Sequence, residues 1–128
     1  MRAAALLFGL AVAAAAGCSS DDADPTPTGS TCPPDSTLTY DNFGATFMGD
    51  YCTRCHASDR HGEDRHGAPL YHDFDTFDGI IVVADHVDEY AAAGPDATNT
   101  LMPPDGTAPS EEERLQLGEW LACELDQI

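Results

Sequence analysis

The sequence predicts a small all-α domain with three main helices. Apolar residues recur at helical spacing in three separate segments, and the sequence has no alternation of strands and helices of the βαβ kind. The chain has 128 residues, which is enough for one domain. Without an export signal and a polar tether, fewer than about a hundred residues remain to build a core. So small a domain gains from a cross-link or from a large apolar ligand.

The first helix is expected over residues 36–51 and leads directly into Cys52. Steps of three, four and four residues separate its aromatic residues, which are Tyr40, Phe43, Phe47 and Tyr51. This spacing places them on one face of a helix and predicts that they belong to the core. Either Thr39 or Ser36 is expected to cap the N-terminus.

Two further helices are predicted in the second half of the chain. Asp75 is the expected N-cap of the second helix, with Asp78 imitating a capping box, and Gly94–Pro95 is expected to end it. Its apolar face consists of Phe77, Ile80, Ile81, Ala84, Val87 and Ala91. Ser110 and Glu113 form a capping box at the start of the last helix. The apolar face of that helix consists of Leu117, Trp120, Leu121 and Leu125.

The composition is strongly acidic. Asp and Glu together number 23, Lys and Arg together number five, and the formal net charge is −18. Nucleic acid and anionic membrane surfaces are therefore not expected as partners, because binding to phosphates requires clustered cations. A partner protein with a basic surface is compatible with this charge, and solubility alone is an equally good explanation of it.

The first 31 residues are expected to lie outside the fold. In residues 1–17, Arg2 precedes an apolar run too short to span a bilayer, which predicts an export signal. The sequence up to Cys18 resembles the lipobox of bacterial lipoproteins, in which the cysteine is acylated, although Ala15 stands where leucine is usual. The alternative is an ordinary signal peptide. Residues 18–31 are polar, acidic and proline-bearing, which predicts a flexible tether.

Cys52 and Cys55, followed directly by His56, form a C-x-x-C-H motif. On a short helical turn both sulfurs point to one side, where each can form a thioether with a haem vinyl group. The histidine can then bind the iron. The motif therefore predicts one covalent haem c with His56 as an iron ligand. A redox dithiol would need a βαβ fold, and a zinc site would need a second ligand pair at finger spacing, and the sequence has neither.

Met102 is the candidate for the second iron ligand. It lies in a polar loop over residues 96–108, and Pro103 and Pro104 follow it directly. The two prolines exclude helical conformation and predict a stiff, extended strap. Such a strap can present a thioether sulfur to the open face of a haem. The alternative is a methionine that fills a gap in the core.

Two cysteines remain, Cys32 and Cys123, near opposite ends of the expected domain over residues 32–128. In an oxidising, exported compartment this even remainder predicts a disulfide. The loop-entropy estimate for such a bridge is about 4–5 kcal/mol, and it is an upper figure. The alternative is two unpaired thiols, with Cys123 as a small core residue.

Together these motifs resemble the class I cytochromes c, especially the short haem-bearing lipoproteins of bacteria, and the resemblance covers residues 32–128. In that family a glycine eight residues before the first haem cysteine lets the first helix cross the last one closely, and Gly44 occupies this place. The apolar residues implied at the crossing are Met48, where an aromatic is more usual, Leu117, Trp120 and Leu121. The resemblance implies that the Pro69 carbonyl binds the other imidazole nitrogen of His56, and that Met102 is the axial methionine.

The resemblance also implies a small cytochrome c fold around one haem and a non-enzymatic function in electron transfer on the periplasmic side of the cell envelope. The implied partners are redox proteins with a basic docking face, and membrane contact would occur only through lipid on Cys18. Ser19 after the lipid-bearing cysteine favours the outer membrane.

The alternatives are a haem enzyme or ligand sensor with an open sixth site, and a haem-free metal-binding lipoprotein. A bis-histidine haem would use His61, His66, His72 or His86. The segment over residues 61–67 is expected to be a solvated loop rather than a metal site.

Overall fold

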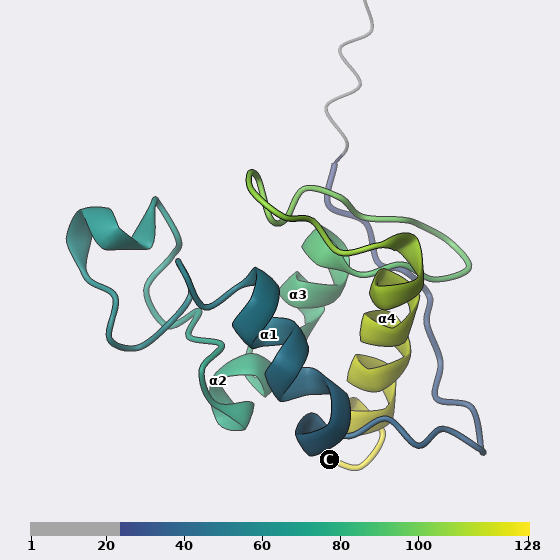
Figure 1. The fold of residues 1–128 in the computed structure, drawn as a ribbon. Coiled ribbons are helices and arrows are strands. Elements are labelled where there is room, and N and C mark those ends of the chain that lie inside the picture. Colours follow the sequence, from purple (N-terminus) through teal and green to yellow (C-terminus); the bar gives the residue numbers. More distant parts are fainter. Residues whose placement is uncertain (1–23) are drawn as a thin grey trace, which may run out of the picture.

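The computed structural model describes residues 24–128 of the chain. The helices of this part are η1 (Tyr40–Gly44), α1 (Ala45–Tyr51), η2 (Gly62–Arg65), α2 (Phe77–Ile81), α3 (Ala84–Ala91) and α4 (Glu111–Leu125) (Figure 1). The described residues contain an isolated bridge but no strand, so the domain is all-α, as predicted. Among its helices, none has the length and apolarity needed to cross a membrane. The predicted signal peptide and Cys18 lie outside the described residues.

The first predicted helix is present, and it begins with a π-helical turn. Thr39 and not Ser36 is its N-cap: Thr39 Oγ1 accepts from the Asn42 N–H at 3.2 Å, and Asn42 Oδ1 accepts from the Thr39 N–H at 2.8 Å. The η1 turn continues directly into α1. The aromatic face packs against α4, with the ring centroids of Phe43 and Trp120 6.1 Å apart. The prediction that this face belongs to the core is therefore confirmed.

The first and last helices meet at Gly44, as the resemblance implied. A Cβ at this position would lie 2.5 Å from Cζ2 of Trp120, a separation that real Cβ atoms do not reach. Glycine is thus the residue that allows the backbone of η1 to approach α4 this closely. The core residues at most 1% exposed near this contact are Met48, Leu117, Trp120 and Leu121. Leu125 was expected on the same face, but as the last residue of α4 it is 46% exposed.

The second predicted helix differs from expectation, because it is divided into α2 and α3. Its N-cap is Thr76 rather than Asp75, whose carboxylate accepts hydrogen bonds from Ser58 instead. The division comes at Val83, where φ is −134° and ψ is 28°. Residues 80–83 are all β-branched, and a run of such residues lowers helix propensity. The capping box predicted at Ser110, by contrast, is confirmed.

The N-terminal segment over residues 26–31 is part of the fold, although it was expected to belong to a flexible tether. Thr28 is fully buried, and its N–H and hydroxyl donate to the two carboxylate oxygens of Asp88 in α3, at 2.8 and 2.5 Å. Asn99 Nδ2 donates to the Thr26 carbonyl at 2.6 Å. Composition predicted a spacer because the segment has little apolar surface to bury. Hydrogen bonds hold it in place instead.

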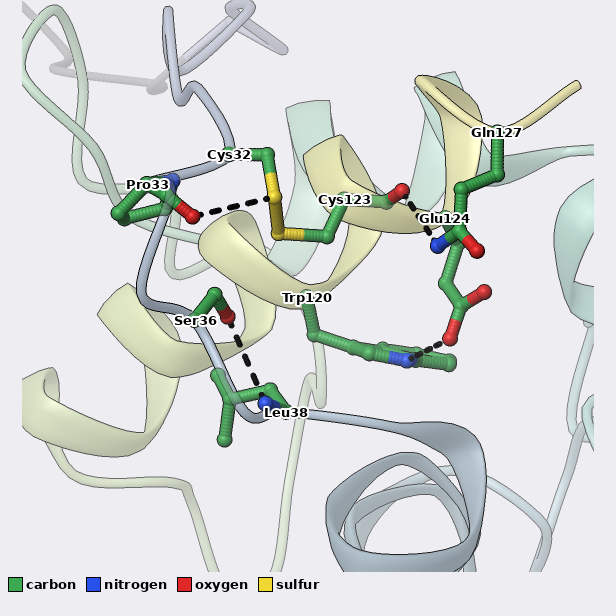
Figure 2. The surroundings of a disulfide bond; sticks show 8 residues. All are labelled: Cys32, Pro33, Ser36, Leu38, Trp120, Cys123, Glu124 and Gln127. Atoms are coloured by element: carbon green, nitrogen blue, oxygen red, sulfur yellow. Dashed lines mark hydrogen bonds between the residues drawn. A yellow bond between two sulfur atoms is a disulfide. The ribbon is translucent and has the colours of Figure 1, made fainter.

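Cys32 and Cys123 form the predicted disulfide (Figure 2), with their Cα atoms 4.5 Å apart. The bridge attaches the N-terminal segment to α4. One turn away, Nε1 of Trp120 donates to Oε1 of Glu124 at 2.8 Å. The two cysteines are 91 residues apart in sequence, so the bridge closes a loop that contains most of the domain. A loop of this size restricts the unfolded chain strongly.

Candidate functional site

The described part of the chain contains a cavity of about 710 Å³, which is mainly apolar. This volume lies within the ~300–1,000 Å³ range of small-molecule and cofactor sites. Most of its wall comes from four segments: the C-x-x-C-H turn, residues 65–74, α3, and the loop that crosses the top of Figure 1 before α4. Pro25 and two residues of α1, Phe47 and Tyr51, complete it. All five residues expected at a cofactor site line it, namely Cys52, Cys55, His56, Pro69 and Met102. The fold thus brings together residues that are up to 50 positions apart in sequence.

The C-x-x-C-H residues form a turn that continues from the end of α1. The Cys52 N–H donates to the Met48 carbonyl at 2.9 Å, and the His56 N–H donates to the Cys52 carbonyl at 2.9 Å. Cys52 and Cys55 carry free thiols. Burial raises the pKa of the Cys52 thiol to about 12, so this thiol is neutral at pH 7. Redox dithiols work with a lowered thiol pKa, and this environment therefore argues against that alternative.

His56 is held in one orientation and one tautomer. Its Nδ1 lies 3.1 Å from the carbonyl oxygen of His72, and because a carbonyl can only accept, Nδ1 carries the hydrogen. Nε2 therefore keeps its lone pair. The ring stacks on Phe74 with centroids 4.6 Å apart and planes 8° from parallel. Burial lowers the pKa of His56, which favours the neutral ring that metal ions bind.

The prediction that Pro69 supplies the carbonyl for His56 is wrong, because His72 supplies it. The Pro69 carbonyl accepts instead from Nη2 of Arg65 at 2.6 Å. Between Pro69 and His72 in the sequence, Tyr71 has a φ of 68°, which is in the left-handed region that an aromatic residue rarely adopts. The hydrogen bond to the imidazole is thus present, with an acceptor three residues further along the chain.

Arg65 organises the segment that carries this carbonyl. The residue is only 4% exposed, and its Nη1 lies 2.8 Å from Oδ1 of Asp73 and 3.0 Å from the Ala57 carbonyl oxygen. Its Nη2 also donates to the His72 carbonyl at 3.3 Å. The loop over residues 61–67 is exposed, as expected, except at Arg65. Sequence reasoning missed Arg65, and the one available signal was the scarcity of cations in the chain.

Met102 lies in the wall of the cavity, and both of its backbone groups are hydrogen-bonded. Its N–H donates to the Tyr90 carbonyl at 2.9 Å, and its carbonyl accepts from Nη1 of Arg114 at 2.9 Å. The side chain is partly buried and also packs against the apolar core. Its place in the wall is what an iron ligand needs, and its packing is what the alternative of a gap-filling methionine requires.

A second arginine links the methionine loop to the C-x-x-C-H turn. Arg54 stands between the two cysteines, and its Nη2 donates to the Asp105 carbonyl at 2.6 Å and forms an ion pair with the Asp105 carboxylate. Both side chains are exposed to solvent. The pair therefore closes one edge of the cavity wall with a contact of modest strength. Neither partner had a local sequence signature.

Other histidines surround the same cavity. His66, His72 and His86 are among the lining residues, and His61 is not. Nε2 of His72 and Nδ1 of His86 lie 3.0 Å apart, and the two rings are stacked with centroids 5.3 Å apart. Over residues 24–128 no group of three or more His, Cys, Asp and Glu residues is arranged to hold a metal ion.

Fold and site together define an all-α domain with a mainly apolar cavity. Two free thiols, a neutral imidazole and a thioether line that cavity. Comparisons of the chain with protein-family models, with curated proteins and with solved structures find no match. The chemistry of these side chains is therefore what indicates a function.

Proposed function

We propose that the protein is a monohaem c-type cytochrome that transfers electrons in the cell envelope and is not an enzyme. One observation carries this proposal: Cys52, Cys55, His56 and Met102 all line one mainly apolar cavity of about 710 Å³. The residues fit a covalent haem. Both thiols are free to form thioethers, and the hydrogen on Nδ1 of His56 leaves Nε2 available for iron.

Each residue has a distinct role in this proposal. Cys52 and Cys55 would hold the group in the cavity, and His56 and Met102 would bind its iron. A bound haem supplies a one-electron ferrous–ferric couple. If both side chains bind the iron, no coordination position would remain for a substrate, as in an electron carrier rather than an enzyme. The apolar wall favours the ferrous form, and the acidic surface favours the ferric form.

The charge and the N-terminal sequence support the proposed partners and location. The formal net charge of −18 would attract a redox partner with a basic docking face. The proposed export signal and an acylated Cys18 would hold the domain on the periplasmic side of the envelope. Ser19 favours the outer membrane over the inner one.

Mass and absorption measurements test the haem directly. The full chain, with its own N-terminal residues, is produced in a bacterium that attaches haem to C-x-x-C-H proteins. We expect the mass of the exported chain to increase by one haem and sharp absorption bands to appear in the reduced form. The single variants Cys52→Ser and Cys55→Ser should attach less haem, and His61→Ala, outside the cavity, serves as the control. Export of the bare polypeptide would overturn the proposal.

The sixth ligand is tested by replacing Met102. In oxidised protein, methionine ligation gives a long-wavelength absorption band. Met102→Ala should lose that band and keep its covalent haem, whereas the neighbouring control Leu101→Ala should keep both. A band that persists in Met102→Ala would show that another group binds the iron.

A second candidate is a haem with two histidine ligands, and it rests on the three further histidines in the cavity wall, His66, His72 and His86. In that case the spectrum of Met102→Ala would match that of the unmodified protein. One of the variants His66→Ala, His72→Ala or His86→Ala would then change the spectrum of the oxidised iron. The electron-transfer function would remain, at a lower reduction potential.

A further inference from the structure

Arg114 lies in the first part of α4 and is almost completely buried, with 3% of its surface exposed. Its Nη1 lies within hydrogen-bond distance of three carbonyl oxygens: 2.6 Å from Ala91, 2.9 Å from Asn99 and 2.9 Å from Met102. These carbonyls belong to the end of α3 and to the loop before α4. One buried nitrogen thus joins two segments of the cavity wall.

The charge of Arg114 calls for an explanation. In the part of the chain that the structure describes, no carboxylate lies within ion-pair distance of its guanidinium, whereas the other buried arginine, Arg65, pairs with Asp73 at 2.8 Å. Removing a cation from water without a carboxylate partner is unfavourable. An apolar side chain of similar length could fill the same space without this penalty. A cation kept here indicates a use for its hydrogen bonds.

We propose that Arg114 is a positioning residue that holds Met102 in place as the axial ligand, an inference that rests on the proposed cytochrome function. The Met102 backbone is bound from two sides, by the Tyr90 carbonyl at its N–H and by Arg114 at its own carbonyl. With both backbone groups held, the side chain has little freedom to leave the cavity wall. The guanidinium also places a positive charge beside the wall, which opposes the extra positive charge of ferric iron.

Competition with imidazole measures how firmly Met102 is held. Imidazole is added to the oxidised, haem-loaded protein, and the loss of the methionine–iron absorption band is followed. Arg114→Gln removes both the charge and the Nη1 donor, whereas Arg114→Lys keeps the charge on a side chain that ends one bond short of the Nη1 position. In both variants we expect imidazole to displace half of the Met102 ligand at a concentration roughly ten- to a hundred-fold lower. This is the factor in an equilibrium constant that one hydrogen bond from a charged donor contributes. The adjacent, exposed Leu115→Gln should behave like the unmodified protein.

The reduction potential separates positioning from a merely structural role. Arg114→Gln should lower the potential more than Arg114→Lys, because only the glutamine variant loses the buried charge. If both folded variants need as much imidazole as the unmodified protein, the positioning role is overturned and the proposed function stands. If Arg114→Gln does not fold, Arg114→Lys alone decides in the same way. Unmodified protein that carries no haem, or carries haem without the methionine band, would overturn the ligation on which the inference rests.

Discussion

The two sides of the cavity are built from the same kind of contact but differ in charge balance. The His56 side consists of the C-x-x-C-H turn and residues 65–74. There Arg65 is buried, binds several loop carbonyls and pairs with Asp73 at 2.8 Å. On the Met102 side, Arg114 is equally buried and binds three carbonyls, and no carboxylate within the described residues pairs with it. The exposed contact of Arg54 with Asp105 connects the loop that carries Met102 to the C-x-x-C-H turn.

The difference suggests a division between stability and ligand placement. A chain this short has few apolar residues with which to fix long loops, and a guanidinium can gather several carbonyls at once. Arg65, with its ion pair, should contribute mainly to the folding of the His56 side. Arg114 should contribute mainly to where Met102 lies.

The largest effect is expected from Arg65→Gln. The substitution leaves Asp73 without its cation and leaves several carbonyls without a donor, which should lower the free energy of unfolding by ~3–5 kcal/mol. Urea unfolding, followed by circular dichroism, measures this. Arg60→Gln is the control, since that side chain is 44% exposed and its contact with Asp59 is 3.8 Å long. A loss below about 1 kcal/mol for Arg65→Gln would mean that the His56 side does not depend on its arginine.

A smaller effect is expected where the helices cross. In Gly44→Ala the new Cβ would collide with the ring of Trp120, and we expect a loss of ~1–3 kcal/mol in the free energy of unfolding from overpacking. Gly49→Ala is the matched control in α1, because nothing lies within 4 Å of its Cβ. That control should gain ~0.5–1 kcal/mol, since alanine favours helix more than glycine does. Equal effects in the two variants would contradict the close approach at Gly44.

The smallest effect concerns pH on the His56 side. Hydrogen bonds from Oγ of Ser58 at 2.6 Å and from its N–H at 3.0 Å lower the pKa of Asp75 below its unfolded value of about 3.9. The stability they contribute is therefore present above that unfolded value and is lost as pH falls through the lower folded pKa. Ser58→Ala should destabilise the protein at pH 6, and the difference from the unmodified protein should shrink towards pH 2. In an Asp75→Asn background, the effect of Ser58→Ala should no longer depend on pH.

Much of the fold could be predicted from sequence where the signal was local. The Ser110 capping box depends on residues three apart, and the aromatic face of the first helix depends on helical spacing. The disulfide between Cys32 and Cys123 followed from counting cysteines once the motif and Cys18 had been set aside. The position of Gly44 came from the family resemblance. Each of these features depends either on a fixed spacing in the sequence or on a residue type, such as cysteine or glycine, that has few possible structural roles.

The rest depended on contacts that leave no local pattern. Arg65 and Arg114 bind backbone carbonyls, and every residue of the chain has a carbonyl, so no spacing identifies the acceptors. For the same reason, the sequence did not identify the carbonyl of His72, rather than that of Pro69, as the acceptor for the imidazole of His56. Thr28 was assigned to a tether because composition reports apolar burial and does not report hydrogen bonds to a distant aspartate.

The excess of acidic over basic residues leaves the domain with a negative surface. Among residues 24–128, Arg65 and Arg114 are buried, and Arg54 and Arg60 lie beside Asp105 and Asp59, while many carboxylates remain at the surface. Two such molecules repel each other, and so do the domain and anionic lipid headgroups, within a Debye length of about 8 Å at physiological ionic strength. If Cys18 is acylated as proposed, the domain would stand away from the bilayer and from its neighbours, and its faces would be open to a cationic protein that diffuses past.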